Sequence, residues 1–269
     1  MSDLSDVLEI ATVTHSGMVR SHNEDSIATD AAMGLAVLAD GMGGYNAGEV
    51  ASGIAVAMIS ADLKKALAAA EDLDVTKVER LVGEHAVRAN NAIYQASQSQ
   101  PQYAGMGTTL VVALWHDNKL VAGHIGDSRL YRFRGDRLEQ VTRDHSLLQE
   151  QIDSGLITRE QARHSQNKNL VKRAVGIDPE VEAEVHSYDV QPGDIYLLCS
   201  DGLNDMVQDE DMQLTLSSLQ ANLPLAAEQL VQQANDNGGR DNVSVILVRV
   251  LKSFPARGGL VGKLKSWFR

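Results

Sequence analysis

The sequence predicts an α+β fold in which helices cover the outer faces of β-sheets. Three observations support this prediction. Short apolar runs of strand length occur near both ends and in the middle of the chain, two pairs of helical segments lie between them, and no internal repeat or low-complexity linker interrupts this order. With 269 residues, of which 43% are hydrophobic and 22% are charged, the chain can bury a sizeable core.

The first part of the chain begins with two strands and continues with two helices. Residues 8–14 and 35–39 are runs of strand length, and the second run is apolar throughout, which predicts a buried strand. Residues 48–70 have a helical, alanine-rich composition. Residues 76–97 place apolar side chains at helical spacing, which predicts a second helix.

After residue 97, the spacing of apolar residues changes from that typical of a helix to that typical of strands. Residues 108–115, 119–125 and 129–134 read as short strands separated by Asp117-Asn118 and by Gly126-Asp127-Ser128. Because Asp, Asn and Gly favour tight turns, this segment predicts an antiparallel meander. The rest of the chain predicts short helices at 146–154 and 158–163, strands at 182–188, 194–200 and 242–250, and helices at 210–218 and 225–237.

The last residues differ in composition from the rest. Five basic residues and no acidic residue follow position 251. We therefore expect one domain over residues 1–251 and a basic tail over residues 252–269. Apolar residues of the tail fall on one helical face beside two lysines, so the tail is either disordered or a weak contact for a membrane or a partner.

Charge and cysteine content exclude several functions. The net charge of −12 is unsuited to general nucleic-acid binding, which needs a basic surface. The single cysteine, Cys199, can form neither an internal disulfide nor a cysteine-based zinc site. In cysteine phosphatases an arginine follows the nucleophilic cysteine by six residues. Here Asp205 occupies that position, so we expect Cys199 to be a buried core thiol. No signal peptide and no long apolar stretch is apparent, which favours a cytoplasmic protein.

Carboxylates recur at the ends of the predicted strands. A lone Asp-Gly pair usually marks only a turn. Here acidic residues recur along the chain, at Glu24, Asp25, Asp40, Asp127, Asp201 and Asp241. Strand ends of a small sheet protein lie close together, and two unit charges about 4 Å apart repel by about 4 kcal/mol at an effective dielectric constant of about 20. Such a cluster requires cations, and its oxygen ligands favour Mg²⁺ or Mn²⁺, a pair of which can activate water against a phosphate ester.

Six short segments occur in an order and at a spacing typical of one family: RSHNED, LADGMGG, GTT, HIGDSR, LLCSDGL and GGRDNVS. Over about residues 8–250 the chain resembles the metal-dependent protein phosphatases (the PPM or type 2C family), in their bacterial serine/threonine branch. The resemblance implies a β-sandwich of two antiparallel sheets flanked by helix pairs, an α-β-β-α arrangement. It also implies a flap over the site, at about residues 149–175.

The same resemblance assigns roles to individual residues. Asp40, Asp201 and Asp241 match the side chains that hold two core Mn²⁺ or Mg²⁺ ions, with Asp40 bridging both. The Gly41 carbonyl matches a further metal ligand. Arg20 matches the arginine that binds the substrate phosphate, and it completes the expected catalytic set with the three aspartates.

Further residues match the outer parts of such a site. Glu24 and Asp25 match acids that bind water molecules of the metals, and Asp127, with Asp201, matches the ligands of a third, weaker metal. The residue after the DG pair is Met42, whereas some relatives carry a histidine there that is proposed as the general acid. A metal-bound water is therefore the expected acid in this protein.

These matches imply a divalent-metal-dependent serine/threonine phosphoprotein phosphatase. A metal-bridged water would attack the phosphate monoester, and no phosphoenzyme would form. Phosphoserine and phosphothreonine proteins are the expected substrates, and a cognate serine/threonine kinase is the expected partner of a monomeric enzyme. Two alternatives stay open: a phosphatase of an anti-sigma-antagonist circuit, and a catalytically silent pseudophosphatase that serves as a binding module.

The histidines carry little signal. Eight are scattered along the chain without an HxxxH pair. Structural or exposed roles are expected for them, and His145 and His164 are the candidates for contact with substrate.

Overall fold

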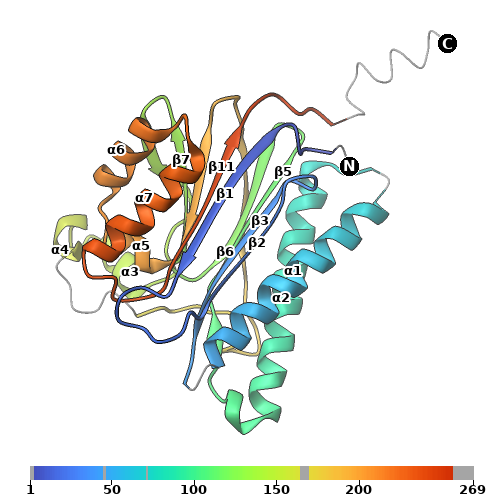
Figure 1. Cartoon of the computed structure of the whole chain (residues 1–269). Helices are drawn as coiled ribbons and strands as arrows, with labels where there is room; N and C mark the ends of the chain where they lie inside the picture. The colour runs from blue at the N-terminus through green and yellow to red at the C-terminus, as the bar shows by residue number, and fades with distance from the viewer. Residues whose placement is uncertain (1–2, 45–46, 71, 164–169, 257–269) are drawn as a thin grey trace.

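Two antiparallel sheets lie face to face, with helices on the outer face of each (Figure 1). The computed structural model describes residues 3–44, 47–70, 72–163 and 170–256. The first sheet has the strand order β1 (Leu8–His15), β11 (Val243–Val250), β10 (Ile195–Cys199), β7 (Arg129–Arg134) and β8 (Arg137–Gln140). The second has the order β2 (Asp25–Asp30), β3 (Leu35–Met42), β5 (Leu110–His116), β6 (Lys119–Ile125) and β9 (Glu184–Asp189), and β4 (Gly107–Thr108) pairs with β3.

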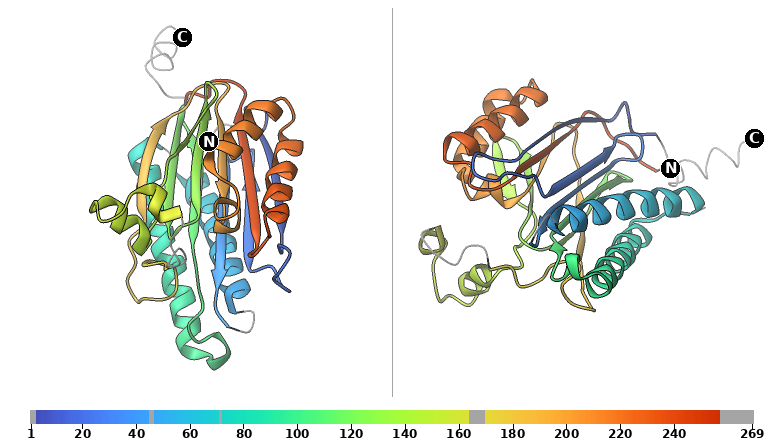
Figure 2. Two further views of the ribbon diagram at one scale, coloured as in Figure 1. Left: turned by 90° about the vertical axis from the view of Figure 1, so that its left-hand side faces the viewer. Right: turned by 60° about the horizontal axis from the view of Figure 1, so that its bottom comes forward.

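Each sheet carries its own pair of helices. α1 (Ala47–Ala69) and α2 (Val75–Ser99) pack on the second sheet, and α6 (Asp209–Leu219) and α7 (Leu223–Asp236) pack on the first (Figure 2). The short elements are η1 (Pro101–Tyr103), α3 (Leu147–Asp153), α4 (Arg159–Arg163) and α5 (Asp201–Asn204). Across the described segments, no helix is long and apolar enough to cross a membrane.

Burial on both faces explains why the central strands are continuously apolar. In β3, Leu35 packs toward α1 and α2, whereas Leu38 packs into the space between the two sheets. Large side chains fill that space, including Trp115 and Tyr196, whose rings meet edge to face with their centroids 5.6 Å apart. A strand covered on both faces needs apolar residues at every position rather than at alternate ones.

The predicted α+β class and the α-β-β-α sandwich are confirmed. The predicted helices and strands are present with small shifts at their ends, and the strand expected at 108–115 is divided into β4 and β5. Strands β2 and β8 were not predicted. Each is an edge strand of its sheet, and the sequences DSIATD and RLEQ are too polar to stand out as buried runs.

The predicted antiparallel meander over residues 108–134 is wrong in its last strand. β5 and β6 form the expected hairpin, but β7 leaves their sheet and pairs with β10 and β8 in the other. The chain changes sheets directly after β6, where Gly126 has a φ of +104°, a conformation that residues with a side chain rarely adopt. Asp127 follows at this crossing.

Candidate active site

Acidic side chains from both sheets meet at one end of the sandwich. Asp25 and Asp40 are direct partners across β2 and β3. Asp201 is the first residue of α5, two residues after the end of β10, and Asp241 lies shortly before β11, the neighbour of β10. The charges of Asp25, Asp127, Asp201 and Asp241 all act on the carboxyl group of Asp40. The cluster therefore spans both sheets.

A pair of threonines fixes the backbone of Asp40. The Thr109 N–H donates to the Asp40 carbonyl at 2.8 Å, and the Thr109 hydroxyl accepts the Asp40 N–H at 3.0 Å. The Thr108 hydroxyl donates to the same carbonyl at 2.8 Å. Gly41 follows in a crowded place, because a Cβ atom there would lie 2.6 Å from the Glu24 carbonyl oxygen. Only glycine lets the chain pass so close to the loop before β2.

Asp25 is buried, and two serines hold one of its oxygens. The hydroxyls of Ser200 (2.8 Å) and Ser244 (2.6 Å) both donate to Oδ2. The other oxygen, Oδ1, is buried with no hydrogen-bond partner among the residues that the structure describes. Burial raises the pKa of Asp25 to about 6. A buried, unpartnered carboxylate oxygen is suited to a water molecule or a cation.

Arg20 lies on the loop before β2 and faces the acids. Its Nη2 donates to Oδ2 of Asp241 at 2.6 Å, and 52% of its side chain is exposed. Asn242 shapes this loop, because its side chain accepts the Glu24 N–H at 2.8 Å and donates to the His22 carbonyl at 2.8 Å. The guanidinium is thus anchored on one side and open to solvent on the other, where it can bind an anion.

The acids raise one another's pKa values. Burial, followed by the charges of neighbouring acids, holds the pKa of Asp40 and that of Asp201 well above the usual range. Burial and the charge of Asp144 raise the pKa of Asp127 to about 7. Burial also raises the pKa of Glu24. Divalent cations would reverse this mutual repulsion, so the set of oxygen ligands fits Mg²⁺ or Mn²⁺.

Metal-free protein is expected to lose stability as the pH rises from about 4 to about 7. The folded-state pKa is about 6 for Asp25 and about 7 for Asp127, against an ordinary value of 3.8. The folded protein therefore binds these protons more tightly than the unfolded chain, and their removal is destabilising. Thermal unfolding in chelator, at a series of pH values, measures the effect, since about 1 kcal/mol shifts Tm by roughly 2–4 °C at this size.

The matched variant for this test is Asp25→Asn. It has no titrating group at the buried position, so its Tm should fall less with rising pH than that of the wild type. Equal slopes in the two proteins would contradict a raised pKa at Asp25.

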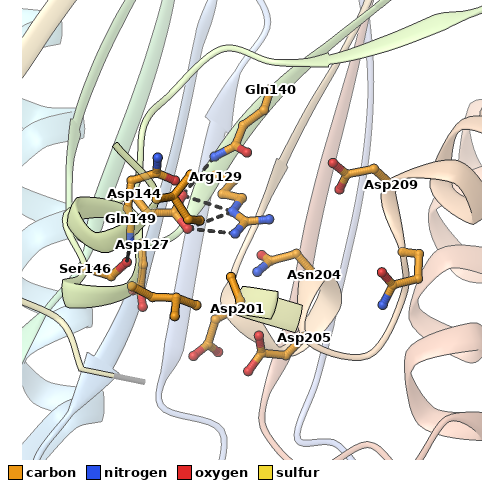
Figure 3. A pocket seen from close by; sticks show the side chains of 14 residues that line it. Asp127, Arg129, Gln140, Asp144, Ser146, Gln149, Asp201, Asn204, Asp205 and Asp209 are labelled. Carbon is orange, nitrogen blue, oxygen red and sulfur yellow. Dashed lines mark hydrogen bonds and ion pairs between the residues drawn. The ribbon is translucent and has the colours of Figure 1, made fainter. Parts of the chain in front are cut away.

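A pocket of about 150 Å³ opens beside the acids (Figure 3). Asp127 and Asp201 line it together with residues of α3 and of the segment from α5 to α6. The carboxylates of Asp201 and Asp205 lie side by side at one edge in Figure 3. Arg129 forms a paired hydrogen bond with Asp144, 2.9 Å from Nε and 2.7 Å from Nη2, which stiffens the opposite wall.

The structure brings the predicted site residues together. The set comprises Arg20, Glu24, Asp25, Asp40, Gly41, Asp127, Asp201 and Asp241. The supporting residues were not predicted, although all but one lie within quoted segments: Thr108, Thr109, Ser200, Asn242, Ser244 and Asp205. Asp205 lies one helical turn after Asp201, a spacing that would have pointed to it.

Three other residues named from the sequence have different outcomes. Cys199 is fully buried in β10, as expected for a core thiol. His145 does not line the pocket; its buried ring faces Glu184, with Nε2 3.4 Å from Oε2. His164 lies outside the described residues.

Comparison with known proteins gives consistent matches. The sequence profile of protein phosphatase 2C matches residues 16–242. The serine/threonine phosphatase stp of Listeria innocua is 37% identical over 240 residues, which cover 87% of this chain and 93% of that protein. A crystal structure of the Mycobacterium tuberculosis serine/threonine phosphatase PstP/Ppp has a TM-score of 0.83 at 37% identity and covers 91% of this chain and 99% of its own. The catalytic domain of PstP in complex with 2 manganese ions has a TM-score of 0.79 at 38% identity, with the same coverage.

Proposed function

The chain belongs to the protein phosphatase 2C family, and we propose that it hydrolyses phosphoserine and phosphothreonine in proteins at the acidic cluster. It is a metal-dependent serine/threonine phosphatase. The assignment of the site rests on the convergence of Asp40, Asp201 and Asp241 from both sheets beside Arg20. The complete set of acids argues against a pseudophosphatase, and no observation favours an anti-sigma-antagonist circuit.

Two core ions are proposed to bind to Asp40, Asp201 and Asp241 and to the Gly41 carbonyl, with Asp40 shared between them. The bound manganese of PstP supports this proposal, as do the raised pKa values of Asp40 and Asp201. Ions of this kind acidify water and neutralise the charge that develops on a phosphate ester. The threonine contacts hold Asp40 in place before any ion binds.

The outer acids have supporting roles in this proposal. Asp127, whose charge is the strongest of those acting on Asp201, would hold a third ion with it. Glu24 and Asp25 would bind water molecules of the metals, since the buried Oδ1 of Asp25 faces no protein donor among the described residues. Met42 carries no proton to donate, so it cannot protonate the leaving oxygen.

Chelation tests the metal requirement. Activity on a small aryl phosphate should be near zero in excess EDTA and should return with Mn²⁺ more fully than with Ca²⁺, because Ca²⁺ prefers looser shells with more ligands. Undiminished turnover in EDTA would overturn the proposal. A phosphopeptide assay under the same conditions checks that the protein substrate follows the same requirement.

Arg20→Ala is expected to raise KM for a phosphopeptide about ten- to a hundredfold, with a smaller change in kcat, since a charged hydrogen bond contributes roughly 1.5–3 kcal/mol. Steady-state kinetics at saturating Mn²⁺ measures both constants and removes any effect of the Arg20–Asp241 contact on metal affinity. Arg240→Ala, an exposed arginine next to Asp241, is the matched control. An unchanged KM for Arg20→Ala would mean that Arg20 does not bind the phosphate.

One catalytic domain with a flap at about residues 149–175 is proposed. The position of α3 and α4 beside the pocket supports a flap there. We place the end of this domain beyond residue 251, since Phe254 is buried and its N–H donates to the Asn118 side chain at 2.6 Å. Most of the basic tail, residues 257–269, lies outside the described residues, so its contact with a membrane or a partner stays a prediction.

We also propose a cellular setting for this activity. A serine/threonine kinase is proposed to supply the phosphoproteins, which rests on analogy with the relatives. We propose a monomeric enzyme in the cytoplasm, since a single chain supplies all the residues of the proposed site. Phosphoproteomics with and without the protein would identify the substrates.

A further inference from the structure

Three side chains of metal-binding types meet at the edge of the second sheet, apart from the acidic cluster. His124 on β6 is the direct cross-strand partner of Glu184 on β9. His145 comes from the loop that leads into α3. One ligand atom of each side chain lies within 4.8 Å of the others. Three separate segments of the chain thus converge on one point.

His124 is buried and the side chain of His145 is largely covered, whereas the glutamate reaches solvent. His124 is 3% exposed, and the side chains of His145 and Glu184 are 8% and 37% exposed. Burial lowers the pKa of His124 and that of His145, so both rings are neutral at neutral pH. Neutral imidazole is the form that binds metals, and the exposed side of Glu184 offers a path of entry.

Contacts around the rings orient them. Nε2 of His124 donates to the Arg143 carbonyl at 2.8 Å, and a ring nitrogen that donates to a carbonyl is the usual support of a metal-bound histidine. The two rings stack with their centroids 4.5 Å apart. Nε2 of His145 lies 3.4 Å from Oε2 of Glu184. Two ligands at the corners of a tetrahedron, with bonds of about 2.0–2.1 Å, lie about 3.4 Å apart.

We propose that His124, His145 and Glu184 form a zinc-binding site at the base of the segment that carries α3 and α4. Two imidazoles and one carboxylate are a ligand set for Zn²⁺ that leaves a position for water. Mg²⁺ and Mn²⁺ favour carboxylates, carbonyls and water instead, which the acidic cluster supplies. The protein would therefore carry a nitrogen-rich site suited to Zn²⁺ and, separately, an oxygen-rich site suited to Mg²⁺ or Mn²⁺.

Zinc at this site would change the contact between His145 and Gly126. The Gly126 N–H donates to Nδ1 of His145 at 3.2 Å, so the single proton of the neutral ring lies on Nε2 and points toward Glu184. A zinc ion on Nε2 takes the place of that proton, and the ring proton then lies on Nδ1, which can no longer accept from Gly126. Because Asp127 follows Gly126, zinc is expected to loosen this turn and to lower phosphatase activity.

Zinc uptake by the full-length protein tests the proposal. The protein is saturated with Mn²⁺ and titrated with Zn²⁺ by calorimetry, and bound zinc is counted after dialysis. Glu184→Gln keeps the shape of the side chain and removes its charge, and Glu182→Gln, at an exposed position before the same strand, is the matched control. Wild type and Glu182→Gln should bind one more zinc ion than Glu184→Gln, or bind it at least about tenfold more tightly.

Equal zinc counts and affinities in the three proteins would overturn the site. His145→Gln takes the place of Glu184→Gln if circular dichroism shows that the latter does not fold. Zinc should also speed hydrogen exchange at the Gly126 amide in the wild type and not in Glu184→Gln, and unchanged exchange with zinc bound would overturn the link to Gly126. Glu184→Gln should keep its turnover in Mn²⁺ alone, so a failure of this proposal is distinguishable from a failure of the phosphatase assignment.

Discussion

Asp40→Asn is expected to remove essentially all phosphatase activity, a loss of at least about a thousandfold in kcat/KM, or about 4 kcal/mol of transition-state stabilisation. Asp40 lies at the point where the charges of four other aspartates converge, and it is the ligand proposed to be shared by both core ions. Asparagine keeps the shape of the side chain but supplies only one neutral oxygen ligand. Calorimetry with Mn²⁺ and rates on a phosphopeptide should therefore show loss of both ions and of turnover together.

Without metal, Asp40→Asn should be at least as stable as the wild type. Removing one charge from a group of acids that repel one another is expected to leave Tm in chelator unchanged or higher. Asp30→Asn is the control, because Asp30 lies at the other end of the same hairpin and pairs with Lys64 at 3.0 Å. Substantial activity in Asp40→Asn, with Mn²⁺ bound at the wild-type stoichiometry, would contradict its role as the shared ligand.

The positions of Asp40 and Asp201 could be predicted because only strand ends are needed to find them. An apolar run followed by Asp40, or by Ser200 and Asp201, identifies both the strand and its end. The hydroxyl partners of Asp25 could not be found in this way. Ser200 and Ser244 come together only through the pairing of β10 with β11, and no local pattern in the sequence encodes that register.

Local sequence patterns also could not predict to which sheet each strand belongs. The turn after β6 contains Gly126, Asp127 and Ser128, which fits a hairpin as well as it fits a crossing to the other sheet. The tertiary packing decides between them, since β7 pairs with β10. The group of His124, His145 and Glu184 was missed for a similar reason. His124 and Glu184 meet only through the pairing of β6 with β9, and His145 reaches them from the loop before α3.

Asp127→Asn is expected to keep the two core ions and to lose about ten- to a hundredfold in kcat, a typical contribution of a proton-transfer group. Asp127 is 7% exposed and lies at the crossing between the sheets, where it acts on Asp201 more strongly than any other charge. Its proposed role is to hold a third, weaker ion. Met42 supplies no proton for the leaving oxygen, so turnover should depend on the third ion that Asp127 is proposed to hold.

A metal titration separates this role from that of a turn residue. Wild-type activity should rise again at millimolar Mn²⁺ after the first two ions are bound, and Asp127→Asn should lack this second rise. Asp117→Asn is the control, because Asp117 is a turn aspartate at the other end of the β5–β6 hairpin, with a φ of +49° that asparagine also tolerates. Full activity of Asp127→Asn across the titration would mean that a third ion has no part in turnover. A loss of the core ions in that variant would instead place Asp127 among their own ligands, since its charge is also felt at Asp40.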